Sequence, residues 1–119
     1  MDNISFDTIM AEMATAINGK DILDPDKWLN WGLKLSVVIE MYEEPKRIEL
    51  EHQIALSEVV MKELYPEMSG KDIDRKTKTT QLWKDLQHQK SKIEMADKLI
   101  MIAKKNAQFA SDEMRRNTL

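Results

Sequence analysis

The residues able to do metal or acid–base chemistry are few and scattered along this chain. His52 and His88 each stand among charged neighbours, without a second histidine three or four positions away. Glu49-x-x-His52 has the spacing of a di-iron ligand pair, but such a site needs a second pair on a facing helix, and this is the one instance. With no cysteine and three glycines among 119 residues, thiolate sites, disulfides and glycine-rich phosphate loops are excluded. The sequence therefore predicts a protein without a metal, a cofactor or a catalytic activity.

Positive side chains are the remaining groups with a recognisable chemistry. Residues 1–70 hold six basic and fourteen acidic residues, and residues 71–119 hold twelve basic and seven acidic ones, which gives balances of −8 and +5. Contacts to nucleic-acid phosphates need lysine and arginine side chains spread along an accessible face. The candidates form two clusters: Lys71, Arg75, Lys76 and Lys78 in the first, and Lys98, Lys104, Lys105, Arg115 and Arg116 in the second.

A charge asymmetry of this kind also arises in proteins that bind no nucleic acid. A long solvated helix needs lysines for solubility, and acidic and basic halves of a chain can face each other in an assembly. The acids that interleave with the basic residues weaken the field: Asp72, Asp74, Asp97, Asp112 and Glu113. Binding of nucleic acid by one copy would therefore be weak, and a multimer would be needed to add such faces together.

The element that carries both basic clusters is a long C-terminal helix, expected at about residues 73–116 and capped by Asp72 or Asp74. Its apolar and small residues follow the 3,4 spacing of a coiled-coil seam from Thr79 onward. We predict an oligomer seam formed by Leu86, Gln89, Ile93, Ala96, Ile100, Ala103, Ala107, Ala110 and Met114. Because many of these side chains are small, a partner helix could approach closely.

Two further features of this helix bear on assembly. A second stripe, formed by Met95, Leu99, Ile102 and Phe109, indicates partners on two sides, and self-association would supply them. Gln89 at a core position either fixes register by pairing with another polar group or lies at an edge and reaches water.

The preceding elements are also helical. Residues 6–18 form an amphipathic helix that Ser5 can cap and Gly19 can end. Asp24 and Pro25 begin a helix at residues 25–43 that is apolar over more than half its circumference, and we expect it to be the most buried element. Its tryptophans, Trp28 and Trp31, are more typical of core anchors than of a base-stacking platform, and Gly32 would permit a close helix crossing.

Pro45 disfavours helical geometry at the residue before it, so we expect a break there and a third helix at about residues 46–65; a single kinked helix is the alternative. The polar segment from Pro66 to Lys71 is short enough to make the last two helices an antiparallel hairpin. The predicted fold is all-α: a single helical domain over 1–119, an elongated bundle with a long coiled-coil-like C-terminal helix.

In layout the chain resembles small helical phage proteins encoded among recombination functions and, more distantly, the UvsY recombination-mediator family. The resemblance covers about residues 24–116. Its parts are Asp26-Lys27-Trp28-Leu29-Asn30 opening a helix, a charged helix ending near Tyr65, a short polar break, and a closing helix with Trp83-x-x-Leu86, Lys104-Lys105 and Glu113-Met114-Arg115-Arg116. The family would imply an oligomeric assembly that binds single-stranded DNA and helps to load a recombinase onto strands covered by a single-strand-binding protein.

Two functions are therefore expected from different classes. The first is an oligomeric, non-enzymatic accessory protein of phage-type recombination or replication, in the cytoplasm of an infected or lysogenic bacterial host. Its partners would be single-stranded DNA and a recombinase or single-strand-binding protein. The second is a helical adaptor or inhibitor that binds a protein partner and has no nucleic-acid role. No run of apolar residues approaches a membrane span, so no membrane partner is expected.

Overall fold

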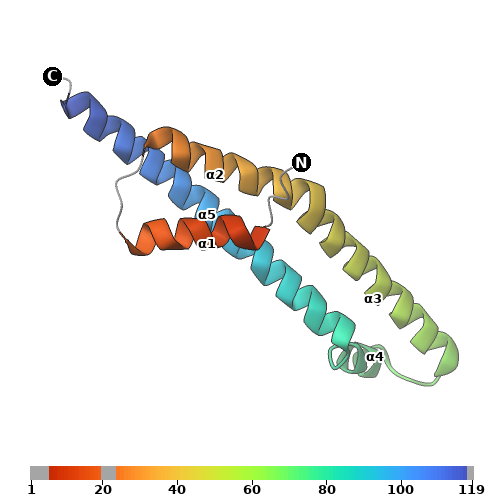
Figure 1. The fold of residues 1–119 in the computed structure, drawn as a ribbon. Helices are drawn as coiled ribbons and strands as arrows, with labels where there is room; N and C mark the ends of the chain where they lie inside the picture. The colour runs from red at the N-terminus through yellow and green to blue at the C-terminus, as the bar shows by residue number, and fades with distance from the viewer. Residues whose placement is uncertain (1–5, 20–23, 118–119) are drawn as a thin grey trace. The chain divides into compact units, whose positions relative to one another are not determined.

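The computed structural model describes residues 6–19 and 24–117, and every regular element among them is helical (Figure 1). The elements are α1 (Phe6–Asn18), α2 (Pro25–Val38), the π-helical segment η1 (Ile39–Glu43), α3 (Glu44–Leu64), α4 (Gly70–Thr77) and α5 (Gln81–Asn117). The all-α prediction and the long C-terminal helix are confirmed. The proposed Ser5 cap lies outside the described residues. No described helix is long and apolar enough to cross a membrane.

The chain divides into two compact units, which we describe one at a time. Unit 1 comprises residues 1–41 and 94–119, and unit 2 comprises residues 42–93. Helix α5 contributes its C-terminal part to unit 1 and its N-terminal part to unit 2.

In unit 1, α1 has the predicted bounds and buries one face, formed by Phe6, Ile9, Met13 and Ala16. The indole Nε1 of Trp31 in α2 donates a hydrogen bond of 3.0 Å to Glu12 Oε2 of α1. This bond satisfies the one polar atom of a largely buried tryptophan, so it helps to fix α1 on α2.

Helix α2 begins as predicted, with Pro25 in its first turn and the Asp24 side chain accepting a hydrogen bond of 3.0 Å from the Asp26 amide. Trp28 and Trp31 are buried and meet edge to face, with ring centroids 5.1 Å apart, so they are core residues. The helix is not buried all round, however. A second stripe, formed by Leu29, Leu33 and Val37, is exposed.

The C-terminal part of α5 lies against α2. A Cβ built on Gly32 would stand 3.6 Å from the Cβ of Ala103, which confirms a close approach at this glycine. Four small seam residues of unit 1 are buried: Ala96, Ala103, Ala107 and Ala110. Ile100 is half-buried, and Met114 is exposed. The alanine seam is thus covered within one chain, without a second copy.

The break expected at Pro45 is wrong, because the backbone is helical without interruption from Pro25 to Leu64. The π-helical segment Ile39–Glu43 precedes the proline, which occupies the first turn of α3. A π turn is wider than an α turn and gives the proline ring room beside the preceding carbonyl groups, while the first turn of a helix needs no donor from it. The chain therefore absorbs the proline instead of ending the helix.

In unit 2, α3 runs antiparallel to the N-terminal part of α5, as predicted. Lys92 lies 3.3 Å from Glu43, the residue before α3, and Lys90 lies 3.8 Å from Glu51 within α3. The hydrogen bonds to Glu44 and Glu51 raise the pKa of Arg47 on α3. Seam residues Leu86 and Ile93 are buried here.

The long helix does not begin at residue 73 as expected. Ser69 caps a separate helix, α4, which ends at Thr77, and Lys78 to Thr80 separate it from α5. The hydroxyls of Thr79 and Thr80 donate to the carbonyls of Lys76 and Thr77, at 2.7 and 2.6 Å. Threonine hydroxyls that bond the local backbone compete with helical hydrogen bonds, which explains the interruption. Thr79 consequently lies in an exposed turn instead of opening the seam.

Gln89 is buried and pairs with a polar group, as the first of the two sequence alternatives predicts. Its Nε2 donates to the Glu43 carbonyl oxygen at 3.0 Å and to Glu43 Oε2 at 2.6 Å. Glu43 is buried too, and Lys92 faces its other carboxylate oxygen. This cluster fixes the register of α3 against α5 at the residue where the π-helical segment ends.

Candidate functional site

The groups that could carry metal chemistry do not come together. Among residues 6–19 and 24–117, no three His, Asp or Glu side chains form a cluster suited to a metal ion. His52 and His88 are both exposed. Glu49 of the Glu-x-x-His pair accepts a hydrogen bond from Gln53 at 3.4 Å.

The first basic cluster lies at the corner of unit 2, where α3 ends, α4 crosses and α5 begins. We call the surface formed by Tyr65, Lys71, Arg75, Lys76, Lys78 and Trp83 the α4 corner. All four of its basic residues are exposed. Ser69 sets the start of α4 by accepting a hydrogen bond of 3.2 Å from the Asp72 amide, and the buried side chains of Ile73 and Thr77 hold its inner face.

Two of these lysines lie over aromatic rings. The Nζ of Lys76 is 5.1 Å from the ring centroid of Tyr65, and the Nζ of Lys78 is 5.8 Å from that of Trp83. Lys78 also lies 3.2 Å from Asp74. A cation over a ring face gains electrostatic attraction from the ring. The corner therefore presents positive charge and aromatic surface together.

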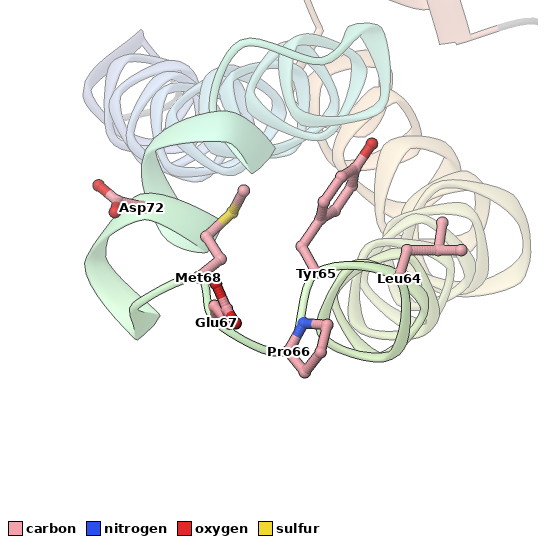
Figure 2. A pocket seen from close by; sticks show the side chains of 6 residues that line it. All are labelled: Leu64, Tyr65, Pro66, Glu67, Met68 and Asp72. Carbon is pink, nitrogen blue, oxygen red and sulfur yellow. The ribbon is translucent and has the colours of Figure 1, made fainter.

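A hollow of about 540 Å³ adjoins the corner (Figure 2). It is lined by Leu64, Tyr65, Pro66, Glu67, Met68 and Asp72. Figure 2 shows the side chains of Tyr65 and Met68 extending to the same side, between the end of α3 and α4. The tyrosine is half exposed, at 50% of its full area. A planar ligand could thus reach one side of this ring.

The net charge of the corner is small. Residues 65–85 hold five basic and four acidic residues, a balance of +1. Phosphate attraction at one corner is accordingly modest, and aromatic contact would have to supply much of any affinity.

The second basic cluster belongs to unit 1. Lys98, Lys104, Lys105, Arg115 and Arg116 are all exposed on α5, as their sequence positions predict. Arg116 lies 3.5 Å from Glu113 one turn earlier. Lys104 lines a hollow together with Asp24 and Asp26, so acidic residues share its surroundings.

Tyr65 is the member of the α4 corner that sequence reasoning missed. It stands at the end of α3, eleven positions before Lys76, in a segment whose pattern predicts a helix end followed by a loop. The signal that could have found it is the Ser69 cap of a short α4, because the turn before that helix brings Lys76 back over the ring. Trp83 belongs to the closing-helix motif, and its sequence position does not single it out as a partner of Lys78.

The chain matches no protein-family model and has no significant match among curated proteins or solved structures.

Proposed function

We propose that this chain is a non-enzymatic accessory protein that binds single-stranded DNA through the α4 corner. The observation that carries the proposal is the pairing of Lys76 with Tyr65 and of Lys78 with Trp83 at the α4 corner. Proteins that bind single strands combine positive side chains along the backbone with aromatic rings on which bases stack. In a duplex the base faces are already stacked, so this surface favours a single strand.

The setting we propose is phage-type recombination or replication, with a recombinase or a single-strand-binding protein as a further partner. The support for this setting is the resemblance in layout over residues 24–116. Because the balance at the corner is only +1, one corner alone would bind weakly, and we propose that the protein acts as an oligomer whose corners add their affinities on one strand.

The test is fluorescence anisotropy with a labelled oligothymidine and a duplex of equal length. Tyr65→Ala should lose about 1–3 kcal/mol of single-strand binding, the usual cost of removing one stacked base contact. Tyr42→Ala is the matched control, because Tyr42 is a second exposed tyrosine of unit 2.

Lys76→Glu should also weaken binding and reduce its salt dependence, whereas Lys46→Glu, at an exposed position of α3, should do neither. Absence of binding at roughly 50 mM salt, or equal affinity of the wild type and Tyr65→Ala, would remove the proposal.

One observation favours the alternative, a helical adaptor for a protein partner. The outer face of α3 exposes Leu56, Val60 and Leu64 at four-residue spacing. Exposed apolar surface of this kind marks sites of protein association. An adaptor of this type would show no oligonucleotide binding in the anisotropy experiment, which separates the two functions.

A further inference from the structure

The exposed stripe of α2 and the adjoining surface of α5 form a second unassigned face, in unit 1. On α2, Leu29, Leu33 and Val37 are 53%, 64% and 44% exposed, although they occupy the interior of a fourteen-residue helix. Beside Leu29 and Leu33, on α5, lie Ile100, half-buried, and Lys104, exposed. We call these five residues the α2–α5 face.

This face is hollowed along the line where the two helices meet. One hollow of about 230 Å³ is lined by Leu29, Leu33, Ile100 and Lys104 above Gly32 and Ala103. A second, of about 410 Å³, shares Leu29 and Lys104 and continues past Ala107 to Met114. The small residues at the floor keep the helices close and leave a groove that runs parallel to them. A groove of this shape accepts another helix.

The charged groups on this face have a definite order. Asp26 lies at the N-terminal end of the α2 stripe, and Lys104 lies across the groove on α5; both are exposed and line the same hollow. Glu40 follows the stripe at its other end and is exposed as well. Lys27 is turned away, since its Nζ lies 5.6 Å from the ring centroid of the buried Trp31. Along the stripe, α2 therefore presents acid, and α5 presents a lysine.

We propose that the α2–α5 face binds the same face of a second copy, so that α2 of each copy packs on α5 of the other. A two-fold axis parallel to the helices produces this arrangement and brings Asp26 of each copy to the level of Lys104 of the other. A two-fold axis perpendicular to the helices would instead pack α2 of one copy antiparallel on α2 of the other. Asp26 of each copy would then lie near Glu40 of the other copy. Like charges at that position oppose the second arrangement.

The proposed dimer is an antiparallel four-helix arrangement with an isologous interface, in which Leu29, Leu33 and Val37 lose their exposure to water. It does not depend on nucleic-acid binding, because the α4 corner belongs to unit 2. It also differs from assembly through the alanine seam, which the chain already buries.

The oligomeric state of the full chain, without nucleic acid, tests the proposal. Sedimentation velocity should give a dimer for the wild type and a monomer for Leu33→Asp. Leu56→Asp is the matched control, because Leu56 is an equally exposed leucine on α3 and should leave the dimer intact. Helical circular dichroism of each variant establishes that it is folded.

A charge exchange tests the arrangement. Asp26→Lys and Lys104→Asp should each weaken the dimer by roughly tenfold or more, and the double variant should regain most of the loss. No recovery in the double variant would exclude α2 packing on α5 of the second copy.

A monomeric wild type would exclude a second copy as the occupant of the groove, and a helix of another protein would then be the candidate occupant. A dimer dissociated by Leu56→Asp but not by Leu33→Asp would move the interface to α3.

Discussion

Gln89 illustrates how a polar side chain is held in a helical core. Its amide nitrogen reaches both the backbone carbonyl and the carboxylate of Glu43, and Lys92 faces the other carboxylate oxygen. Each buried donor and acceptor in this cluster thus has a partner, and no unpaired buried side-chain nitrogen or oxygen occurs in the described part of the chain. The cluster has one geometry in which it is satisfied, so it opposes a sliding of α3 along α5.

Replacing the glutamine should cost stability. Gln89→Leu leaves the buried Glu43 carboxylate without its amide donor, and we expect a loss of about 1–3 kcal/mol in the free energy of unfolding, measured in urea. Gln87→Leu, at an exposed position two residues earlier, should change the value by less than about 0.5 kcal/mol. Equal effects of the two substitutions on the free energy of unfolding would show that the Gln89–Glu43 cluster does not stabilise the register of α3 on α5.

At the scale of elements, α5 is one 37-residue helix that serves both units through different residue types. In unit 2 its buried positions are the large Leu86 and Ile93 with Gln89, and in unit 1 they are mostly alanines. Alanines let the α2 backbone approach, which is why Gly32 and Ala103 come together. The length of α5 is limited at its start by the threonines before Gln81.

The contact between α2 and α5 can be probed from both sides. Ala103 is 1% exposed, so Ala103→Leu should lower the free energy of unfolding by about 1–3 kcal/mol through overpacking. Gly32→Ala is the contrasting change, because its new Cβ would meet Ala103 at an ordinary contact distance of 3.6 Å. The gain in helix propensity should then leave Gly32→Ala neutral or more stable by up to about 1 kcal/mol. Thermal unfolding of the three proteins compares them, and a stable Ala103→Leu variant would place Ala103 away from α2.

At the scale of the whole molecule, the candidate sites are divided between the two units. The α4 corner lies in residues 42–93, and the α2–α5 face lies in residues 1–41 and 94–119. The proposed strand binding and the proposed self-association therefore involve separate surfaces, and the residues of one can be changed without altering those of the other. If both proposals hold, each dimer carries two corners that can bind one strand.

This combination predicts an effect of dimerisation on strand affinity. Leu33→Asp should bind a short oligonucleotide, of about 10 nucleotides, as the wild type does, because one corner is enough for it. A long strand that reaches both corners should bind the variant at least roughly tenfold more weakly, because the second contact is lost. Anisotropy titrations with the two lengths measure this. An equal loss at both lengths would mean that Leu33 acts on the corner itself.

The sequence by itself determined the helices and much of their packing. The period of the apolar residues predicted α1, α2 and the buried positions of α5, and Asp24 with Pro25 predicted the start of α2, because these signals are local and depend on the chain's own spacing. The same reasoning predicted a helix break at Pro45, where there is none, and missed the break between α4 and α5. Whether the helix continued depended at Pro45 on the room that a π turn gives the proline, and before Gln81 on the competition of threonine hydroxyls for backbone carbonyls.

The tertiary structure alone decided which apolar surfaces are used. Periodicity identified two stripes on α5 and a broad apolar surface on α2, but it could not say which would be covered by the same chain. The fold buries the alanine seam against its own helices and leaves Leu29 and Leu33 exposed. It also brings Tyr65 to Lys76, because the turn between α3 and α4 reverses the chain. The first result comes from contacts between helices far apart in sequence, and the second from the turn that joins two neighbouring helices; the apolar period within one helix carries no information about either.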